Sequence, residues 1–409
     1  MKFLLVTQYY PPETGACPPR IAGFARELVR MGHDVTVLTG FPNYPQGRWH
    51  DSYAGRVRPC LTETLEGALV RRVWLLPDTR SSAWRRLGSY GSFMTMAVGS
   101  GLGLARPDVV VGTSGPMFAA TAGMALAAIW RVPFVFDVRD IWPGLICEAT
   151  GMSRNAGIRA LERLEMTMYR RAGAILAVTR GIVEDLESKG VSTGKITLLR
   201  NGVDTEVYRP LEVSKTQLRR KWGLPEGPTI ALYAGTVGLL QSLETLLEAA
   251  WGLEGVFVLI AGEGPKRASI KEMAAGMSNV AVLPNQPEEK IVELMNAADV
   301  GVNPNTAVPI NRKAMGVKSY AYMACGLPYL IGNSGECEAY NEEARAGLCV
   351  PPEDVKATRE ALLFFRDNPD EAAEMGRRGL AYARDHHSRP VLARKLLEVA
   401  HGLLGENCA

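Results

Sequence analysis

The stretch from Asp299 to Val350 constrains the fold of this 409-residue chain more than any other. It begins with a short apolar run over Val300–Val302 and continues through a basic loop. Residues Ser319–Cys325 then have helix-forming composition, ended by glycine and proline. The run Tyr329–Ile331 predicts the next buried strand, and a glycine-containing turn follows it. This pattern indicates half of a doubly wound parallel sheet, in which ligands bind at the carboxyl ends of the strands.

Length and composition exclude several classes of protein. A chain of 409 residues is long enough for two or three domains. A hydrophobic content of 47% and a net charge of +3 are ordinary for a globular protein and do not indicate a nucleic-acid partner. The seven cysteines include no C-x-x-C pair, and the apolar run Phe3–Val6 is too short for a signal peptide. We therefore expect reduced thiols and a cytoplasmic protein.

The first half opens with a strand–turn–helix–strand unit. Lys2–Thr7 predicts a strand, and a long turn containing Gly15 leads to a helix over Pro18–Met31 and a second strand over Asp34–Thr39. By itself, such a glycine turn is weak evidence of function, because many plain βαβ units have one.

A charged cluster follows a later strand of the first half. The run Phe134–Phe136 predicts a strand that delivers Asp137, Arg139 and Asp140 at its carboxyl end, within the segment 137–143. Two carboxylates and an arginine at a strand end are placed for binding or catalysis. The alternative is an arginine–aspartate pair that only holds a loop.

The second half repeats the pattern with two glycine turns. Strands over Thr229–Ala234 and Val256–Ala261 each end in such a turn, at 235–238 and 262–266. Because both turns precede helices, their N–H groups and the helix dipoles favour phosphate.

Several of these segments resemble one family. Lys318–Pro328 looks like the "PSK-x-x-E-Y-M-A-x-G-x-P" segment of retaining glycosyltransferase family 4, which has the GT-B fold. The opening unit and Asn201–Asp204 also match this family. The segments 41–45 and 137–143 are similar to a subfamily that builds surface polysaccharides and O-antigens.

The resemblance implies an α/β architecture of two Rossmann-like, doubly wound domains facing across a cleft. The expected N-terminal (acceptor) domain spans 1–203 and is completed by a C-terminal helix returning over about 388–409. The expected C-terminal (donor) domain spans 204–387.

The resemblance also implies the reaction. We expect glycosyl transfer, with retention of configuration, from an activated sugar to an acceptor hydroxyl or amine. The partners would be a nucleotide-sugar donor and a glycan, lipid-linked or small-molecule acceptor, with no nucleic acid and no cofactor. No Asp-x-Asp occurs in the sequence, so no metal is expected to bridge the diphosphate.

Residue by residue, the resemblance assigns three groups. The predicted catalytic residues are Asp137, Arg139 and Asp140. The predicted donor-binding residues are Gly15, Gly235, Thr236, Gly262, Glu263, Gly264, Lys266, Lys313, Lys318, Gly335 and Glu336. The predicted acceptor-binding residues are Arg20, Asn43 and Tyr44.

The sequence departs from the family at the acids that accept ribose hydroxyls. Lys313 and Ala321 stand where the family's Glu-x7-Glu pattern has glutamates, and Thr236 and Gln241 stand where it commonly has arginine and lysine. Two alternatives therefore stay open. One is a weakened or repurposed GT-B protein that uses a non-nucleotide donor or assists a partner. The other is a nucleotide-sugar epimerase, which shares the architecture.

Residues 84–105 contain no charge between Arg86 and Arg106, close to the length of a membrane span. Glycine and serine are frequent there, which favours a buried helix. An interfacial helix, with Trp84, Arg85 and Arg86 at lipid headgroups in a peripheral membrane contact, is the second interpretation.

Overall fold

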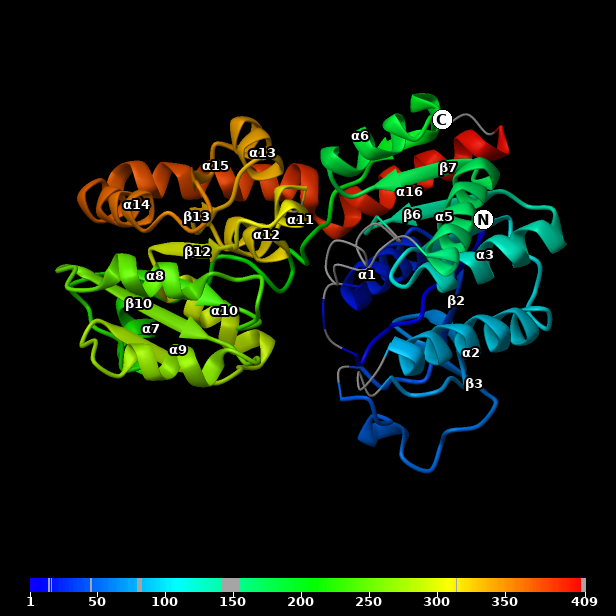
Figure 1. Ribbon diagram of the computed structural model, residues 1–409, viewed down its shortest axis with the longest axis horizontal. Coiled ribbons are helices and arrows are strands. Elements are labelled where there is room, and N and C mark those ends of the chain that lie inside the picture. Colours follow the sequence, from blue (N-terminus) through cyan, green and yellow to red (C-terminus); the bar gives the residue numbers. More distant parts are fainter. Residues whose placement is uncertain are drawn as a thin grey trace. The chain divides into compact units, whose positions relative to one another are not determined.

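The computed structural model of the protein describes residues 1–13, 15, 17–44, 46–78, 83–141, 155–313 and 315–405. The chain divides into two compact units. Unit 1 comprises Met1–Arg200 and Arg389–Ala409, and unit 2 comprises Asn201–Ser388. Each unit is built around one sheet, which confirms the predicted α/β fold class (Figure 1).

Unit 1 has an eight-stranded sheet in the order β3-β4-β2-β1-β5-β6-β7-β8. Only β3, which pairs with β4 at the edge, is antiparallel to its neighbour. The elements in chain order are β1 (Lys2–Val6), α1 (Cys17–Arg30), β2 (Asp34–Gly40), η1 (Asp51–Tyr53), β3 (Cys60–Leu65), β4 (Ala68–Val73), α2 (Ala83–Gly101), β5 (Val109–Thr113), α3 (Met117–Trp130), β6 (Phe134–Val138), α5 (Ala156–Arg171), β7 (Ala174–Ala177), α6 (Arg180–Ser188), η2 (Thr193–Lys195), β8 (Ile196–Leu198) and α16 (Arg389–Leu404).

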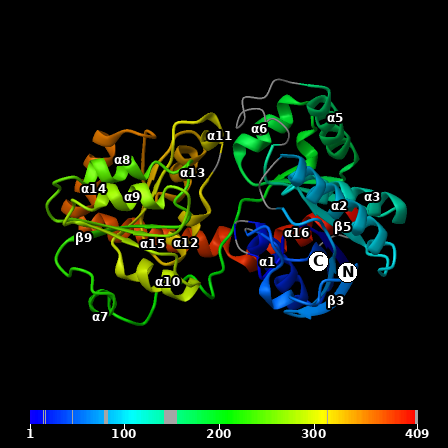
Figure 2. The same ribbon diagram turned by 60° about the horizontal axis from the view of Figure 1, so that its bottom comes forward.

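Helices cover both faces of this sheet, because consecutive residues of its central strands are apolar and point to opposite faces. Helices α1 and α16 pack together against one face, and α2, α3, α5 and α6 contribute to the core of the other (Figure 2). The last helix of the chain therefore completes the first sheet, from Arg389 onward.

The weakly charged segment 84–105 forms most of α2, whose two sides differ in exposure. Phe93 and Ala97 are fully buried against the sheet and α3, whereas Trp84 near the start of the helix is 83% exposed. The first interpretation, a buried helix, therefore holds for one face only. Among the described helices, none has the length and apolar composition that crossing a membrane requires.

Unit 2 has a six-stranded, all-parallel sheet in the order β11-β10-β9-β12-β13-β14. This order places a topological switch point between β9 and β12. The elements in chain order are α7 (Lys215–Lys221), β9 (Thr229–Ala234), α8 (Leu243–Ala250), β10 (Val256–Ala261), α9 (Arg267–Ala274), β11 (Val280–Leu283), α10 (Glu288–Ala297), β12 (Val300–Pro304), α11 (Pro309–Arg312), α12 (Val317–Ala324), β13 (Tyr329–Gly332), α13 (Glu336–Ala344), β14 (Gly347–Val350), α14 (Val355–Asp367) and α15 (Pro369–His387).

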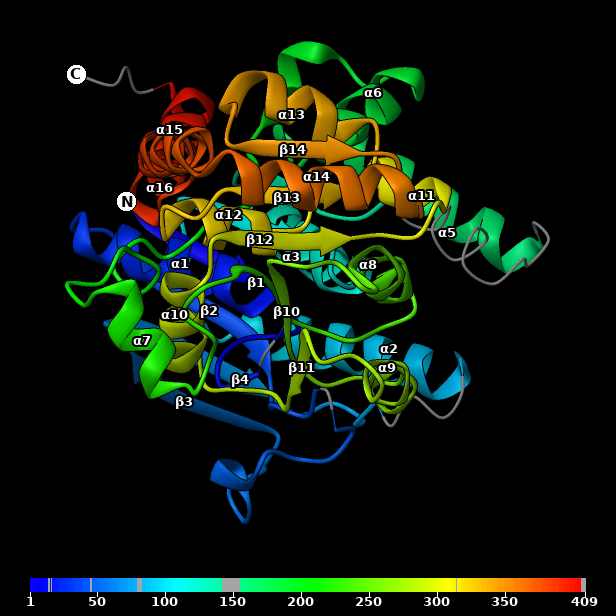
Figure 3. The same ribbon diagram turned by 90° about the vertical axis from the view of Figure 1, so that its left-hand side faces the viewer.

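Two cores enclose the sheet of unit 2. One contains α8, α9 and α14, and the other contains α7, α10, α12 and α13 (Figure 3). Strands buried on both faces read as nearly continuous apolar runs, which explains why their sequence limits were easy to predict.

Tyr322 fixes α12 against the switch point of unit 2. Its buried hydroxyl donates to the carbonyl oxygens of Leu232 on β9, at 3.3 Å, and Val302 on β12, at 3.2 Å. The ring lies against Gly301, where a β-carbon would come within 2.4 Å of it. The helix that carries Lys318 is therefore held between the two central strands.

Candidate functional site

The carboxyl edge of unit 1 has its switch point between β1 and β5. The turn after β1 contains Gly15, which is exposed and has a φ of +118°, a conformation that favours glycine. Thr7, at the end of β1, and Gly115, after β5, both lie within hydrogen-bonding range of the Cys17 thiol. The predicted turn residue thus lies at the edge where a doubly wound sheet binds ligands.

Arg20 and Asp137 occupy the interior of unit 1. The Nη2 atom of Arg20 is 2.8 Å from Oδ1 of Asp137, and the exposed fractions of the two side chains are 1% and 0%. Arg20 also donates to the carbonyl oxygens of Leu199 and Arg200. Neither side chain reaches solvent, and both are engaged in holding the fold. Their roles at a reacting centre and on an acceptor stay predictions.

Arg139 and Asp140 lie one step further along, on the loop after β6. The hydroxyl oxygen of Ser114 accepts the backbone N–H groups of Arg139, at 2.7 Å, and Asp140, at 3.2 Å. Asp140 is exposed, and Arg139 is partly buried beside Gly115 and Cys17. The Nε of Arg139 has no hydrogen-bond partner within the described part of the chain. Asp140 is therefore open to a ligand, whereas the unpartnered Nε of Arg139 is buried. Residues 142–143 lie outside the described residues.

Asn43 and Tyr44, predicted to bind an acceptor, follow β2 at the same edge. Asn43 is 3% exposed, and its side chain bonds the backbone of Phe41 and Asp78. Its amide is therefore engaged in the fold. Tyr44 is partly exposed, with its ring 5.2 Å from that of Tyr9 and close to Gly15. Of these two residues, Tyr44 alone has a side chain that is accessible to a ligand.

In unit 2, the two glycine turns pack directly on each other. The N–H of Gly235 donates to Ala261, and the N–H of Val237 donates to Glu263, each at 2.9 Å. A β-carbon at Gly262 would lie 1.8 Å from the carbonyl oxygen of Gly235, and one at Gly264 would lie 2.2 Å from that of Val237. Glycine is therefore required at both positions for a steric reason. That these turns bind phosphate stays a prediction.

Lys318 lies over the first of these turns. Its Cε would be 2.3 Å from a β-carbon at Gly235, and its Nζ lies 4.6 Å from the centre of the Tyr233 ring. Burial lowers the pKa of Lys318 to about 8, and no described carboxylate neutralises it. A half-buried ammonium group, near the N-terminus of α12 and at the switch point, can attract an anion.

Two polar groups near Lys318 are buried without partners in the described part of the chain. They are Nδ2 of Asn303, at the end of β12, and Oγ of Ser319, in the first turn of α12. Asn303 lies directly against Gly316, where a β-carbon would meet Nδ2 at 2.2 Å. Unpaired buried donors cost free energy, so such groups mark a site that a polar ligand can complete.

Lys266 and Glu263, also predicted to bind the donor, are already paired. Lys266 lies 2.7 Å from Glu244, and Glu263 lies 3.3 Å from Arg267. Thr236 is exposed, and its carbonyl oxygen accepts the hydroxyl of Tyr233. The structure therefore brings Gly235, Thr236 and Lys318 together and leaves Lys266 balanced by a carboxylate.

The positions that replace the family's acids differ in environment. Lys313 is exposed on the loop before α12, whereas Ala321 is 9% exposed within the apolar core of unit 2. Gly335 has a φ of +76°, and a β-carbon there would lie 2.6 Å from the carbonyl oxygen of Arg312. Glu338 accepts the N–H of Gly335 at 3.0 Å, and Glu336 is buried. Glu338 therefore caps α13.

Comparison with known families identifies the chain. The Glycosyl transferase 4-like domain matches residues 15–202, and the Glycosyl transferases group 1 domain matches residues 214–381. The two matches cover most of the chain, in the order expected from the sequence. The chain belongs to the group 1 glycosyltransferases.

Relatives of this glycosyltransferase span nearly its full length. The putative colanic acid biosynthesis glycosyl transferase WcaI of Escherichia coli K12 is 26% identical, covering 90% of this chain and 94% of the relative. A GDP-mannose-dependent phosphatidylinositol monomannoside mannosyltransferase of Mycolicibacterium smegmatis is 23% identical, covering 98% of each chain.

Solved structures share its GT-B fold at low sequence identity. Sucrose-phosphate synthase from Thermosynechococcus elongatus has a TM-score of 0.77 at 16% identity, covering 99% of each chain. Anabaena HepE in complex with UDP-glucose has a TM-score of 0.71 at 15% identity, covering 98% of this chain and all of that one.

The structure adds to the candidate sites four residues that the sequence did not single out. Glu13, Ser114, Asn303 and Ser319 are all buried at the carboxyl edges of the two sheets. Each is a single polar residue in a turn or at an element's end, so no spacing pattern distinguishes it. Among the described residues, no three His, Cys, Asp or Glu side chains gather to hold a metal ion.

Proposed function

We propose that this glycosyltransferase moves a sugar from a nucleotide diphosphate sugar to an acceptor hydroxyl or amine, with retention of configuration and without a metal ion. The observation that carries the proposal is Lys318 above the paired glycine turns of unit 2. A cation, a helix N-terminus and close backbone at one switch point suit a diphosphate.

In this proposal the diphosphate lies along Gly235 and Lys318, with Asn303 and Ser319 supplying the hydrogen bonds that they otherwise lack. Lys318 takes over from the arginine–lysine pair that the family usually has at 236 and 241. The sequence has no Asp-x-Asp pair, which favours stabilisation of the leaving group by lysine and backbone amides.

The acceptor would bind at the carboxyl edge of unit 1. Arg139 and Asp140 project from the loop that Ser114 holds, so they can orient an acceptor hydroxyl. The departing phosphate would help to remove the acceptor proton, as is generally held for retaining members of the family. No side-chain nucleophile is then needed, and the new bond forms on the face that the leaving group vacates.

The names of similar proteins support a nucleotide-sugar donor and a role in building glycans. HepE was solved with UDP-glucose, the mycobacterial relative is named as GDP-mannose-dependent, and WcaI is named for colanic acid biosynthesis. These names suggest a hexose donor and a surface glycan or glycolipid as acceptor.

A second candidate is a repurposed GT-B protein with a donor that lacks ribose. Its support is local: Lys313 and Ala321 replace the two acids, and the nearby carboxylate of Glu338 caps α13. A ribose would then have to find its acceptor elsewhere, with Glu336 as the nearest proposed substitute.

The test is a transfer assay with UDP-, GDP- and dTDP-hexoses and a panel of p-nitrophenyl glycosides as acceptors. We expect nucleoside diphosphate release and a glycosylated product whose anomeric proton coupling matches that of the donor. We also expect the rate to survive excess EDTA. If no nucleotide sugar binds at millimolar concentration while a sugar phosphate or polyprenyl-phosphate sugar does, the second candidate replaces the first.

A further inference from the structure

The carboxylate of Glu13 is enclosed by backbone N–H groups of two separate segments. It is 5% exposed, in the turn after β1. Oε2 accepts the N–H of Tyr10 at 3.1 Å, and Oε1 accepts the N–H groups of Asn43 at 3.0 Å and Tyr44 at 2.9 Å. One side chain thus joins the turn after β1 to the loop after β2.

The chemistry of these three partners selects a carboxylate at position 13. All three are donors, and an ionised carboxylate offers acceptor positions on both oxygens. An amide of the same shape has one oxygen and one NH₂ group. If its oxygen kept Asn43 and Tyr44, its NH₂ group would face the N–H of Tyr10. A glutamine would therefore fit the space and break the bonding pattern.

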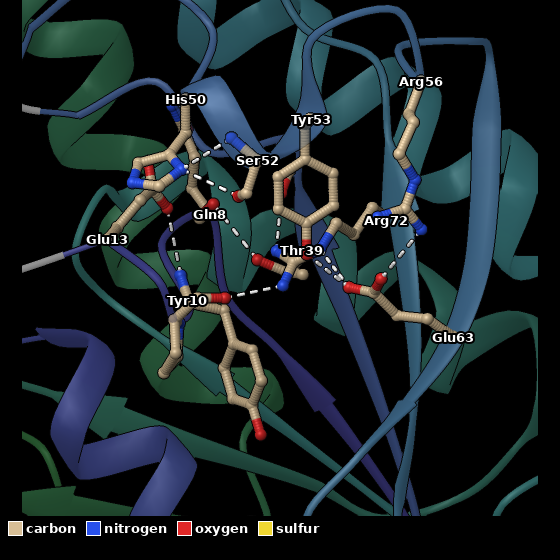
Figure 4. A network of polar contacts seen from close by, with 12 residues as sticks. Gln8, Tyr10, Glu13, Thr39, His50, Ser52, Tyr53, Arg56, Glu63 and Arg72 are labelled. Carbon is tan, nitrogen blue, oxygen red and sulfur yellow. Dashed lines mark hydrogen bonds and ion pairs between the residues drawn. The ribbon is translucent and has the colours of Figure 1, made fainter.

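The same turn is held from the opposite side by Arg72 of β4. This fully buried guanidinium donates to the carbonyl oxygen of Pro11 at 2.6 Å. It also pairs with Glu63 at 2.6 Å and lies 4.8 Å from the ring of Tyr53. Figure 4 shows the turn between these two anchors, with Glu13 on one side and Arg72 on the other. The edge hairpin β3–β4 thus supports the turn.

Glu13 and Arg72 together position a partly exposed surface at the switch point of unit 1, formed by Tyr9, Gly15 and Tyr44. Tyr44 is bonded through its backbone to Glu13, and its ring lies within 3.5 Å of the β-carbon position of Gly15. The Tyr44 ring also packs against the ring of Tyr9, which lies three residues after the end of β1. Tyr9 and Tyr44 are both partly exposed, so this surface can contact a ligand.

We propose that Glu13 is a positioning residue for the acceptor: it locks the turn at 10–13 to the loop at 43–44, so that Tyr9, Gly15 and Tyr44 form one surface for the acceptor to bind. The assignment of this surface to the acceptor rests on the proposed function. The locking of the two segments does not, and it has a readout of its own.

The experiment compares Glu13→Gln and Glu13→Asp with Asp51→Asn, which neutralises an exposed carboxylate on η1 after the same loop. Hydrogen exchange is measured without substrate on peptides covering 41–53, at about pH 8, where Glu13, whose pKa is about 7, is ionised. We expect Glu13→Gln to speed exchange of the Asn43 and Tyr44 amides about tenfold, because both lose a charged acceptor. Glu13→Asp keeps the charge but is too short to span both segments, so it should resemble Glu13→Gln. Asp51→Asn should leave both amides unchanged.

The second readout is steady-state transfer to the p-nitrophenyl glycoside that the wild type uses best. We expect Glu13→Gln to raise the KM for the acceptor about tenfold and to leave the KM for the donor within about twofold. Equal loss in both KM values, or unchanged exchange at Asn43 and Tyr44, would overturn the proposal. A wild type that transfers to no acceptor would count against the proposed function, and the exchange measurement would still decide the role of Glu13.

Discussion

Arg20 on α1 and Asp137 on β6 form a bidentate, fully buried ion pair between residues 117 positions apart. Arg20 also bonds the carbonyl oxygens of Leu199 and Arg200, the last residues of unit 1 before the chain enters unit 2. One arginine therefore ties the first helix, a central strand and the exit of the unit together. Asp137, predicted from the sequence to be catalytic, lies within β6 and is engaged in this structural pair.

The first prediction concerns this pair. Asp137→Asn leaves the Arg20 guanidinium buried without its counter-charge, so we expect unfolding to become easier by about 3–5 kcal/mol. Asp140→Asn, on the same loop but exposed, should change the free energy of unfolding by less than about 1 kcal/mol. Urea denaturation of both variants measures the difference, and equal stabilities would show that the pair contributes nothing.

The second prediction concerns Asp140 in the reaction. Because this carboxylate is exposed on the loop that Ser114 holds, Asp140→Asn should lower the rate of transfer by about tenfold or more and barely shift the melting temperature. Arg139→Gln should behave in the same way. Turnover and thermal melting measured on the same samples decide the matter. Parallel loss of both would instead assign the loop to the fold alone.

The third prediction is a pH dependence at Lys318, whose pKa is lowered to about 8 by burial. The lysine is charged below this pH and neutral above it, so affinity for a nucleoside diphosphate should fall as pH rises from about 7 to 9.5. Lys318→Arg stays charged throughout and should bind with little change over this range. Calorimetry across the range measures both proteins.

Removal of the charge gives a matched control for the same site. Lys318→Met should weaken diphosphate binding by about 1.5–3 kcal/mol, the typical contribution of a charged hydrogen bond. Lys266→Met removes a cation that already pairs with Glu244, so it should have a smaller effect. Comparable losses of affinity in the two variants would mean that the diphosphate does not bind specifically at Lys318.

The fourth prediction is a pH dependence of stability from Glu13. Burial outweighs three N–H hydrogen bonds and raises the pKa of Glu13 from 4.5 to about 7. Since the folded state binds this proton more tightly than the unfolded state, the contribution to stability is complete below about pH 4.5 and is lost as pH rises through 7. The loss should be about 3 kcal/mol, and Glu13→Gln should remove it.

Urea denaturation at several pH values between about 5 and 8 isolates this contribution as the difference between wild type and Glu13→Gln. The groups that face Glu13 include Arg72 and Tyr9, and neither is expected to change charge in this range. A difference that stays constant with pH would show that Glu13 titrates at its ordinary value.

Two central strands of unit 2, β9 and β10, could be predicted to the residue, because they are almost continuously apolar and buried. Thr229–Ala234 and Val256–Ala261 were expected and observed with the same limits. The edge hairpin β3–β4 was not predicted, since residues such as Arg71 and Arg72 interrupt its apolar pattern. Its arginine at 72 is fully buried, and only the tertiary partners Glu63 and Pro11 explain that burial.

The residues of the candidate site also divide into those that the sequence predicts and those that it does not. Glycines at 235, 262 and 264 could be predicted, because their spacing after strands has a direct steric cause. The roles of acids and cations could not, since pairing decides them. Asp137 and Lys266 look available in sequence and are engaged in ion pairs, whereas Lys318 is left without a described acid. The partners in these ion pairs lie far away along the chain, so a local sequence pattern does not reveal them.

The most direct test of the account is to locate the bound donor. Diazirine analogues of UDP, GDP and dTDP can be cross-linked to the intact protein and the modified peptides mapped by mass spectrometry. The account predicts cross-links within 233–241, 262–267 and 303–320 of unit 2, and their loss in Lys318→Met. Cross-links confined to residues before Asn201, or unchanged labelling in Lys318→Met, would contradict the assignment of unit 2 as the donor site.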